Sequence, residues 1–175
     1  MKSNRLLDLK NLKFEVRDVM RYDDVGDYFD NKIIAYDFKD DIITNAIFLH
    51  EFIEYMLIKS SGIDASLIDR FDTDDDAPEM HPREYELYEK FHDMSNRVER
   101  QFIENLGLNW DDYDKTINTK KIKTAVKLIT EELHREHPDE VKIQHSREVV
   151  RESSNSLPND EQKIKIPKIK SNYLK

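Results

Sequence analysis

Three ionisable residues stand together in the most apolar segment of this chain. They are His50, Glu51 and Glu54, within residues 42–59, which read IITNAIFLHEFIEYMLIK. Because His50 and Glu54 are four residues apart, a helix places both side chains on one face, one turn apart. An imidazole and a carboxylate arranged in this way can share a metal ion. Glu51 is then a neighbouring base for a water molecule held at that ion.

A later segment offers two further ligands at helical spacing. His92 and Glu99 are seven residues apart, so a helix again presents both on one side. If the two helices pack antiparallel, one or both of His92 and Glu99 can complete the site. We therefore expect Zn²⁺ or another divalent metal here, with Glu51 as the catalytic base. The expected ligands are His50, Glu54, His92 and Glu99.

The elements that must position these groups are two amphipathic helices. Apolar residues recur at steps of three and four through residues 42–59, which predicts a helix capped by Thr44 or Asp41 and ended by Gly62. Pro82 suits the first turn of a second helix over 82–106. Its expected core positions are Tyr85, Tyr88, Phe91, Met94, Val98, Phe102, Ile103 and Leu106.

The fold class expected from these patterns is α+β and mostly α-helical. Residues 28–29 and 33–38 read as two strands joined by a turn at 30–32, while 1–16 read as either a helix or a strand. A short helix or turn is expected over 63–72. The domain boundaries follow from the change in pattern. They give a metal-binding domain over 1–116, an amphipathic helix over 117–136, and an extended or disordered basic tail over 137–175.

The segment LHEFIEY resembles the HExxH helix of the zinc metallopeptidases, the zincins. In that family two histidines bind zinc, the glutamate between them is the general base, and a later helix supplies a third ligand. The resemblance implies a minimal zincin-like fold in which His50 is a ligand and Glu51 the base of a peptidase-like hydrolase. Glu54 stands where zincins have their second histidine. A carboxylate there lowers the charge of the site and weakens the Lewis acidity of the metal.

A second resemblance covers Val25 to Tyr113, through VGDYF, HEFIEYML, LIDRFD and the later His, VER, Trp and Tyr. It is to a family of small uncharacterised phage and bacterial proteins with an HExxE helix. A later helix of that family carries a histidine and, seven residues on, a glutamate. The resemblance implies the same site residues and adds Asp72.

Two other interpretations of these residues remain open. Glu89 and His92 have the Glu-x-x-His spacing of di-iron carboxylate bundles, so a dimer could build a dinuclear site with Glu51 and Glu54. Alternatively, the protein is a non-enzymatic phage accessory or structural protein. The same residues would then hold a structural ion, form a buried polar network, or simply face solvent.

Composition bounds the partners and the location. The absence of cysteine excludes thiolate metal sites and a cysteine nucleophile. Residues 117–175 hold 13 basic and 9 acidic side chains, which leaves 15 basic and 28 acidic in 1–116. A domain with that acidic excess would not attract nucleic acid, so none is expected. No apolar run is long enough for a membrane. We expect a cytoplasmic protein (host cytoplasm or virion if phage-encoded) whose tail could bind a protein partner.

Overall fold

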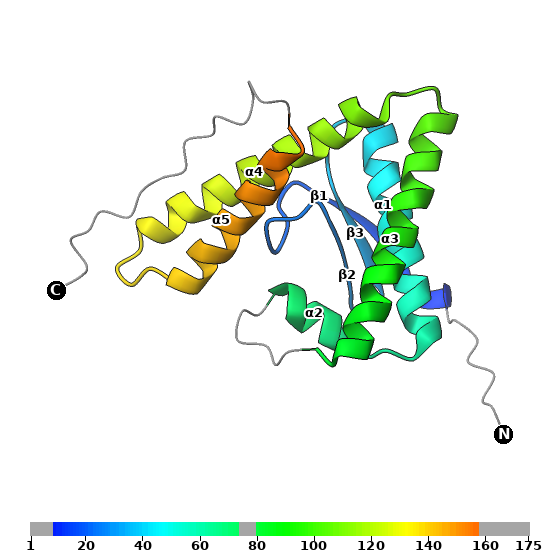
Figure 1. Ribbon diagram of the computed structural model, residues 1–175, viewed down its shortest axis with the longest axis horizontal. Coiled ribbons are helices and arrows are strands. Elements are labelled where there is room, and N and C mark those ends of the chain that lie inside the picture. The colour runs from blue at the N-terminus through cyan, green and yellow to red at the C-terminus, as the bar shows by residue number, and fades with distance from the viewer. Residues whose placement is uncertain (1–8, 74–79, 158–175) are drawn as a thin grey trace. The chain divides into compact units, whose positions relative to one another are not determined.

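A small sheet and several helices make up the part of the chain that the structure, a computed structural model, describes: residues 9–73 and 80–157 (Figure 1). Within these ranges the protein is mostly helical, which confirms the expected α+β class. A 3₁₀ turn over Leu9–Asn11 precedes the sheet. The elements that follow are β1 (Lys13–Arg17), β2 (Gly26–Phe29), β3 (Lys32–Tyr36), α1 (Asp41–Ser61), α2 (Ala65–Thr73), α3 (Pro82–Asn105), α4 (Trp110–Leu133) and α5 (Glu140–Asn155).

The sheet has the strand order β1-β3-β2. β2 and β3 pair antiparallel and form the predicted hairpin. Asp30 and Asn31 at its turn have φ values of 49° and 57°, the left-handed conformation that two-residue hairpin loops require. β1 pairs parallel to β3 and contributes the third strand, so the strand alternative holds for residues 13–16, while residues 1–8 of that prediction lie outside the described residues.

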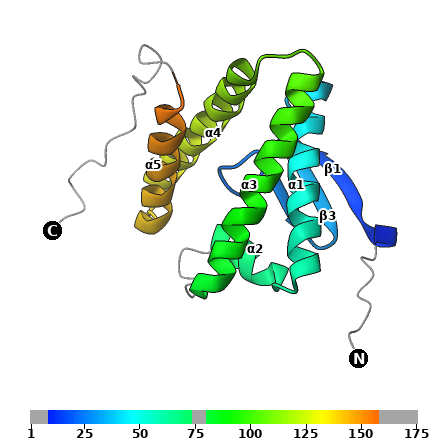
Figure 2. The ribbon, with the colours of Figure 1, turned by 45° about the vertical axis from the view of Figure 1, so that its right-hand side comes forward.

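Helix α1 follows the sheet and packs on β2, β3 and α3 (Figure 2). Asp40 caps its start, since the Asp40 carboxylate accepts hydrogen bonds from the backbone N–H groups of Ile42 and Ile43. The cap predicted at Thr44 or Asp41 was therefore wrong, because the helix begins at Asp41 itself. Gly62 ends the helix as predicted, with φ of 84°.

Helix α3 begins at Pro82 as predicted, and the expected core face is confirmed in part, since Ile103 is buried and Tyr88 and Phe91 pack against the core. Ser95, Glu99 and Ile103 are its buried residues, whereas Tyr85, Met94 and Leu106 are more than 40% exposed. Met94 lies two positions beyond His92 and so roughly 200° round the helix, on the far side. Tyr85 and Leu106 lie near the two ends. The face of α3 that packs on α1 is thus polar near its middle, at Ser95 and Glu99. A search for apolar periodicity does not detect buried polar positions of this kind.

An apolar core adjoins these polar residues, since its member Tyr28 contacts Glu54. Its buried members come from the sheet, α1 and α2, and partly buried side chains of α3 close it. The buried members are Tyr28, Ile33, Tyr55, Ile58, Ile63 and Ile68. The short helix predicted over 63–72 is present as α2. None of the helices in the described ranges combines the length and apolarity that crossing a bilayer requires.

The chain divides into two compact units, Met1–Tyr113 and Asp114–Lys175. In the second unit, α4 and α5 share an apolar core that includes Ile129 and Ile143. The tail predicted over 137–175 is thus wrong for Glu140–Asn155, which form α5. Asp139 caps this helix, and its buried stripe alternates apolar residues with serines, which hid the pattern. The rest of the predicted tail, 158–175, lies outside the described residues.

Candidate metal centre

Helices α1 and α3 bring the predicted site residues together. His50 on α1 contacts Glu99 on α3, and Glu54, one turn later on α1, contacts His92, seven residues earlier on α3. Contacts that advance along one helix and retreat along the other show that the two helices are antiparallel. The convergence expected from the two spacings is therefore present.

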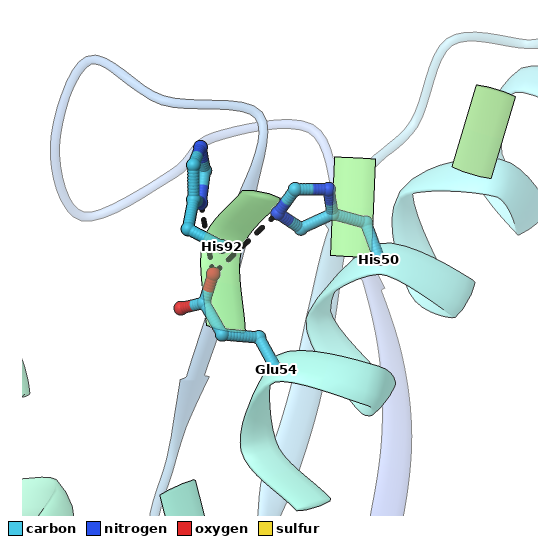
Figure 3. Close-up of side chains that lie close together, drawn as sticks. All are labelled: His50, Glu54 and His92. Carbon is cyan, nitrogen blue, oxygen red and sulfur yellow. Dashed lines mark hydrogen bonds and ion pairs between the residues drawn. The ribbon is translucent and has the colours of Figure 1, made fainter. Parts of the chain in front are cut away.

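Three of these side chains form a cluster of potential metal ligands. Oε2 of Glu54 lies 2.8 Å from Nδ1 of His92 and 3.6 Å from Nε2 of His50 (Figure 3). One donor atom from each of the three residues lies within 4.8 Å of the other two. Neighbouring ligands of a tetrahedral zinc ion are roughly 3.3 Å apart, given bonds of about 2.0–2.1 Å. The cluster therefore needs only small side-chain movements to hold one ion.

Glu99 lies behind His50, away from these donor atoms. Its Oε2 is 2.9 Å from Nδ1 of His50, and its Oε1 accepts a short hydrogen bond from the hydroxyl of Tyr113. A carboxylate at Nδ1 keeps a proton there and turns Nε2 towards the cluster. Of the two α3 residues predicted to complete the site, His92 joins the cluster of potential ligands and Glu99 holds the ring of His50.

Tyr28 gives Glu54 a second anchor. Its hydroxyl donates a hydrogen bond of 2.9 Å to Oε1 of Glu54, so Oε2 is left to face the two histidines. Burial and the charge of Glu54 raise the pKa of Tyr28 well above its ordinary value, which keeps the hydroxyl protonated as a donor. Sequence reasoning missed both tyrosines as site residues. Tyr28 was expected only as a strand residue, and Tyr113 only as the end of the stretch covered by the second resemblance, since nothing in their spacing links them to the histidines.

Glu51, the predicted base, lines the same pocket as His50, Glu54 and His92. Its side chain packs against Gly26 of β2. A Cβ atom at position 26 would lie 2.1 Å from Oε1 of Glu51 and 2.6 Å from Cδ. Gly26 is therefore what leaves room for the Glu51 carboxyl beside the cluster.

The ionisable groups of the cluster shift one another's pKa values. Burial alone would lower the pKa of His50, but its hydrogen bonds to Glu54 and Glu99 outweigh burial and raise this pKa to about 10. Burial would raise the pKa of Glu54, yet its hydrogen bonds to His50 and His92 lower it to about 2. The pKa of Glu51 is raised, chiefly by burial and then by the neighbouring carboxylates. Without a cation, His50 is thus charged, and burial favours the protonated form of Glu51.

The site opens on the side of His92. The His92 side chain is 46% exposed, whereas those of His50 and Glu54 are 9% and 4% exposed. The pocket beside it is lined further by Tyr22, Asp24, Asp69 and Tyr88. A ligand from solvent can therefore reach the donor atoms without opening the core.

The dinuclear interpretation gains no second group of ligands from the described residues. Among them, the donor atoms within 4.8 Å of one another belong to His50, Glu54 and His92. Glu89 is exposed on α3 and interacts with Tyr85. The side chain of Asp72, which the phage-type resemblance added, lies outside the described residues.

Two imidazole nitrogens and one carboxylate oxygen, with an opening beside them, match the ligand types and number of catalytic zinc sites. The same groups also form a hydrogen-bonded network by themselves. Comparisons of the chain with family models, with curated proteins and with solved structures found no match.

Proposed function

We propose that this protein binds a divalent metal ion, with zinc as the first candidate, through His50, Glu54 and His92. The observation that carries the proposal is the contact between Glu99 and Nδ1 of His50. Histidines that ligate metals usually donate their other ring nitrogen to a carboxylate or carbonyl in this way. A histidine on a solvated helix face would have no need of a buried carboxylate at Nδ1.

The activity proposed for the site is hydrolysis of a peptide or a related bond. Zinc with three protein ligands supplies a bound water whose pKa falls to about 7. Glu51 is the base that receives a proton from that water. Its raised pKa works against this role in the metal-free protein. A cation at the adjacent ligands favours the ionised carboxylate and restores the base.

A second candidate function, from a different class, is a non-enzymatic accessory or structural protein of phage type. The hydrogen bonds from Tyr28 to Glu54 and from Tyr113 to Glu99 favour this candidate, because they satisfy the buried groups with no cation present. In that case the network would specify how α3 docks on α1. An ion, if bound, would be structural.

Metal analysis and hydrolysis assays on the same preparations separate the candidates. We expect purified protein dialysed against limiting Zn²⁺ to retain one ion per chain, and His50→Ala to retain none. His134→Ala serves as the matched control, since His134 is exposed directly after α4, in the second compact unit. If the two histidine variants retain equal zinc, the metal site is refuted.

Glu51→Gln tests the hydrolytic step separately. This variant should keep its zinc, because Glu51 is not a ligand, and should lose cleavage of a mixed library of internally quenched peptides. Zinc retention with no cleavage by the wild-type protein would support the structural candidate. Equal cleavage by wild type and Glu51→Gln would refute Glu51 as the base.

A further inference from the structure

Strand β1 is an edge of the sheet with open backbone groups. Lys13 N–H donates to the carbonyl of Asn31, and the carbonyl of Arg17 accepts from Asp37 N–H, so residues 13, 15 and 17 turn their backbone groups towards β3. Phe14 and Val16 lie between them and turn theirs away. Among the described residues, β1 pairs with no strand other than β3. Such an edge is a template for another strand.

The side chains of this edge are unusually apolar for a surface. Phe14 is 56% exposed and Val16 is 50% exposed. The Phe14 ring contacts Phe48 and Phe52 of α1 at centroid distances of 5.5 and 5.9 Å, so Phe14 lies on the face of the sheet that α1 covers. Side chains alternate along a strand, and Val16 therefore shares this face. The margin of the α1-covered face is thus apolar and uncovered beside an open strand edge.

We propose that this edge pairs with the same edge of a second copy, as an antiparallel β1–β1 contact centred on Phe14. Each Phe14 would exchange both backbone hydrogen bonds with Phe14 of the partner subunit. Val16 N–H would donate to the Leu12 carbonyl of the partner subunit. The two sheets would become one continuous sheet about a two-fold axis, and the exposed Phe14 and Val16 side chains of both copies would cover one another.

Charge complementarity favours a second copy in this particular register. On the face opposite α1, centring on Phe14 places Lys13 opposite Glu15 of the partner subunit, twice by symmetry. Centring on Glu15 would oppose two glutamates, and Lys13 would meet Arg17. Centring on Val16 would also oppose Glu15 and Arg17, but it would place Asp18 opposite Phe14 on the apolar face. Among these three registers, only the one centred on Phe14 opposes unlike charges on one face and keeps Asp18 away from Phe14 on the other.

Proline at position 16 tests the backbone pairing in the full chain. Val16 N–H points away from β3, so Val16→Pro removes an edge donor and leaves the β1–β3 ladder intact. Val16→Ala is the matched control, since it shortens the side chain but keeps the N–H. By sedimentation equilibrium at high micromolar concentration we expect a wild-type dimer. The dimer dissociation constant of Val16→Pro should be at least about tenfold higher than that of Val16→Ala. A monomeric wild type, or equal association of the two variants, would overturn the proposal.

A cross-link tests the register and does not depend on the proline variant folding. The chain has no cysteine, so Phe14→Cys carries a single thiol. Directly opposed residues of a hydrogen-bonded antiparallel pair have Cα atoms about 5.5 Å apart, within disulfide range. Val141→Cys is the control, because Val141 is 52% exposed but lies on α5. Mild oxidation should link Phe14→Cys into a dimer much faster than Val141→Cys. Equal rates, with both variants folded by circular dichroism, would contradict the Phe14 register.

Discussion

Oε2 of Glu99 lies 2.9 Å from Nδ1 of His50, on the side of the ring away from Glu54. This contact decides which nitrogen of His50 faces the ligand cluster. It also joins α3 to α1. Because Glu99 is buried, leaving its carboxylate unpaired would destabilise the folded protein. Glu99 thus gives a direct way to disturb the site without removing a proposed ligand.

Replacing Glu99 by glutamine should weaken Zn²⁺ affinity by about 10- to 100-fold, the usual effect of losing an orienting carboxylate. Glutamine keeps the size of the side chain, so the fold should survive. The measurement is competition against a chromophoric chelator. Glu104→Gln is the control, because Glu104 is exposed on the same helix and pairs with Arg100. Equal affinities in the two variants would show that Glu99 does not orient a ligand.

Gly26→Ala should displace the Glu51 side chain, since the added Cβ would overlap its carboxyl. We expect a loss of about 1–3 kcal/mol in the free energy of unfolding, as for other overpacked sites. Glu51→Ala removes the obstructing atoms, so Gly26→Ala should cost much less in that background. A double-mutant cycle by urea unfolding measures the coupling. Additive effects would mean that the two residues are not in contact.

Metal binding at neutral pH should release protons. His50 is charged in the metal-free protein, because its hydrogen bonds to Glu54 and Glu99 outweigh burial and hold its pKa at about 10. Only the neutral imidazole binds a metal, so affinity should rise with pH. Calorimetry in buffers of different ionisation heat measures the number of protons released. The Glu51→Gln variant removes any proton that Glu51 itself would release. Binding that releases no proton in Glu51→Gln would contradict the assignment of His50 as a ligand.

The stability of the metal-free protein should depend on pH in two opposite ways. His50 has its pKa raised from 6.5, so its contribution is complete below about 6.5 and is lost as pH rises through about 10. Glu54 has its pKa lowered from 4.5 to about 2, so its contribution is complete above 4.5 and is lost as pH falls through about 2. Urea unfolding across this range measures both slopes. The alkaline slope should flatten in His50→Gln, and an unchanged slope would exclude His50 as its source.

Helix α5 should contribute measurably to the stability of its unit. Ile143 is buried in the core shared by α4 and α5, and Ile143→Ala should cost about 2–5 kcal/mol. Val141 lies two residues earlier and is 52% exposed, so Val141→Ala should change the free energy of unfolding by less than about 0.5 kcal/mol. Thermal unfolding of the full chain compares the two. Equal effects of the two substitutions would contradict a packed helix over residues 140–155 and would favour the extended or disordered tail.

The positions of His50, Glu54, His92 and Glu99 were predictable because helical spacing alone places each pair on one face. Their convergence required only that the two faces meet, which burial of the surrounding apolar residues enforces. The roles of Tyr28 and Tyr113 were not predictable, since they depend on which strand and which helix end reach the cluster. Gly26 is a similar case, because a glycine in a strand gives no sign of which side chain it makes room for.

The fold shows the same division between local and tertiary signals. The hairpin turn and the C-terminal end of α1 follow from Asp30, Asn31 and Gly62, whose conformations are set locally. The pairing of β1 with β3 is a long-range contact that no local pattern encodes. Helix α5 was missed because Ser146 and Ser153 interrupt its apolar stripe, although both are buried. Small polar residues can pack against a neighbouring helix as closely as apolar ones.

Zinc K-edge X-ray absorption of the loaded protein tests the central claim most directly. We predict one bound ion with two imidazole nitrogens and a carboxylate oxygen at about 2.0–2.2 Å. We also predict that His92→Ala removes one imidazole from the spectrum. A spectrum identical to that of zinc in buffer, or one that His92→Ala leaves unchanged, would contradict a metal site at His50, Glu54 and His92.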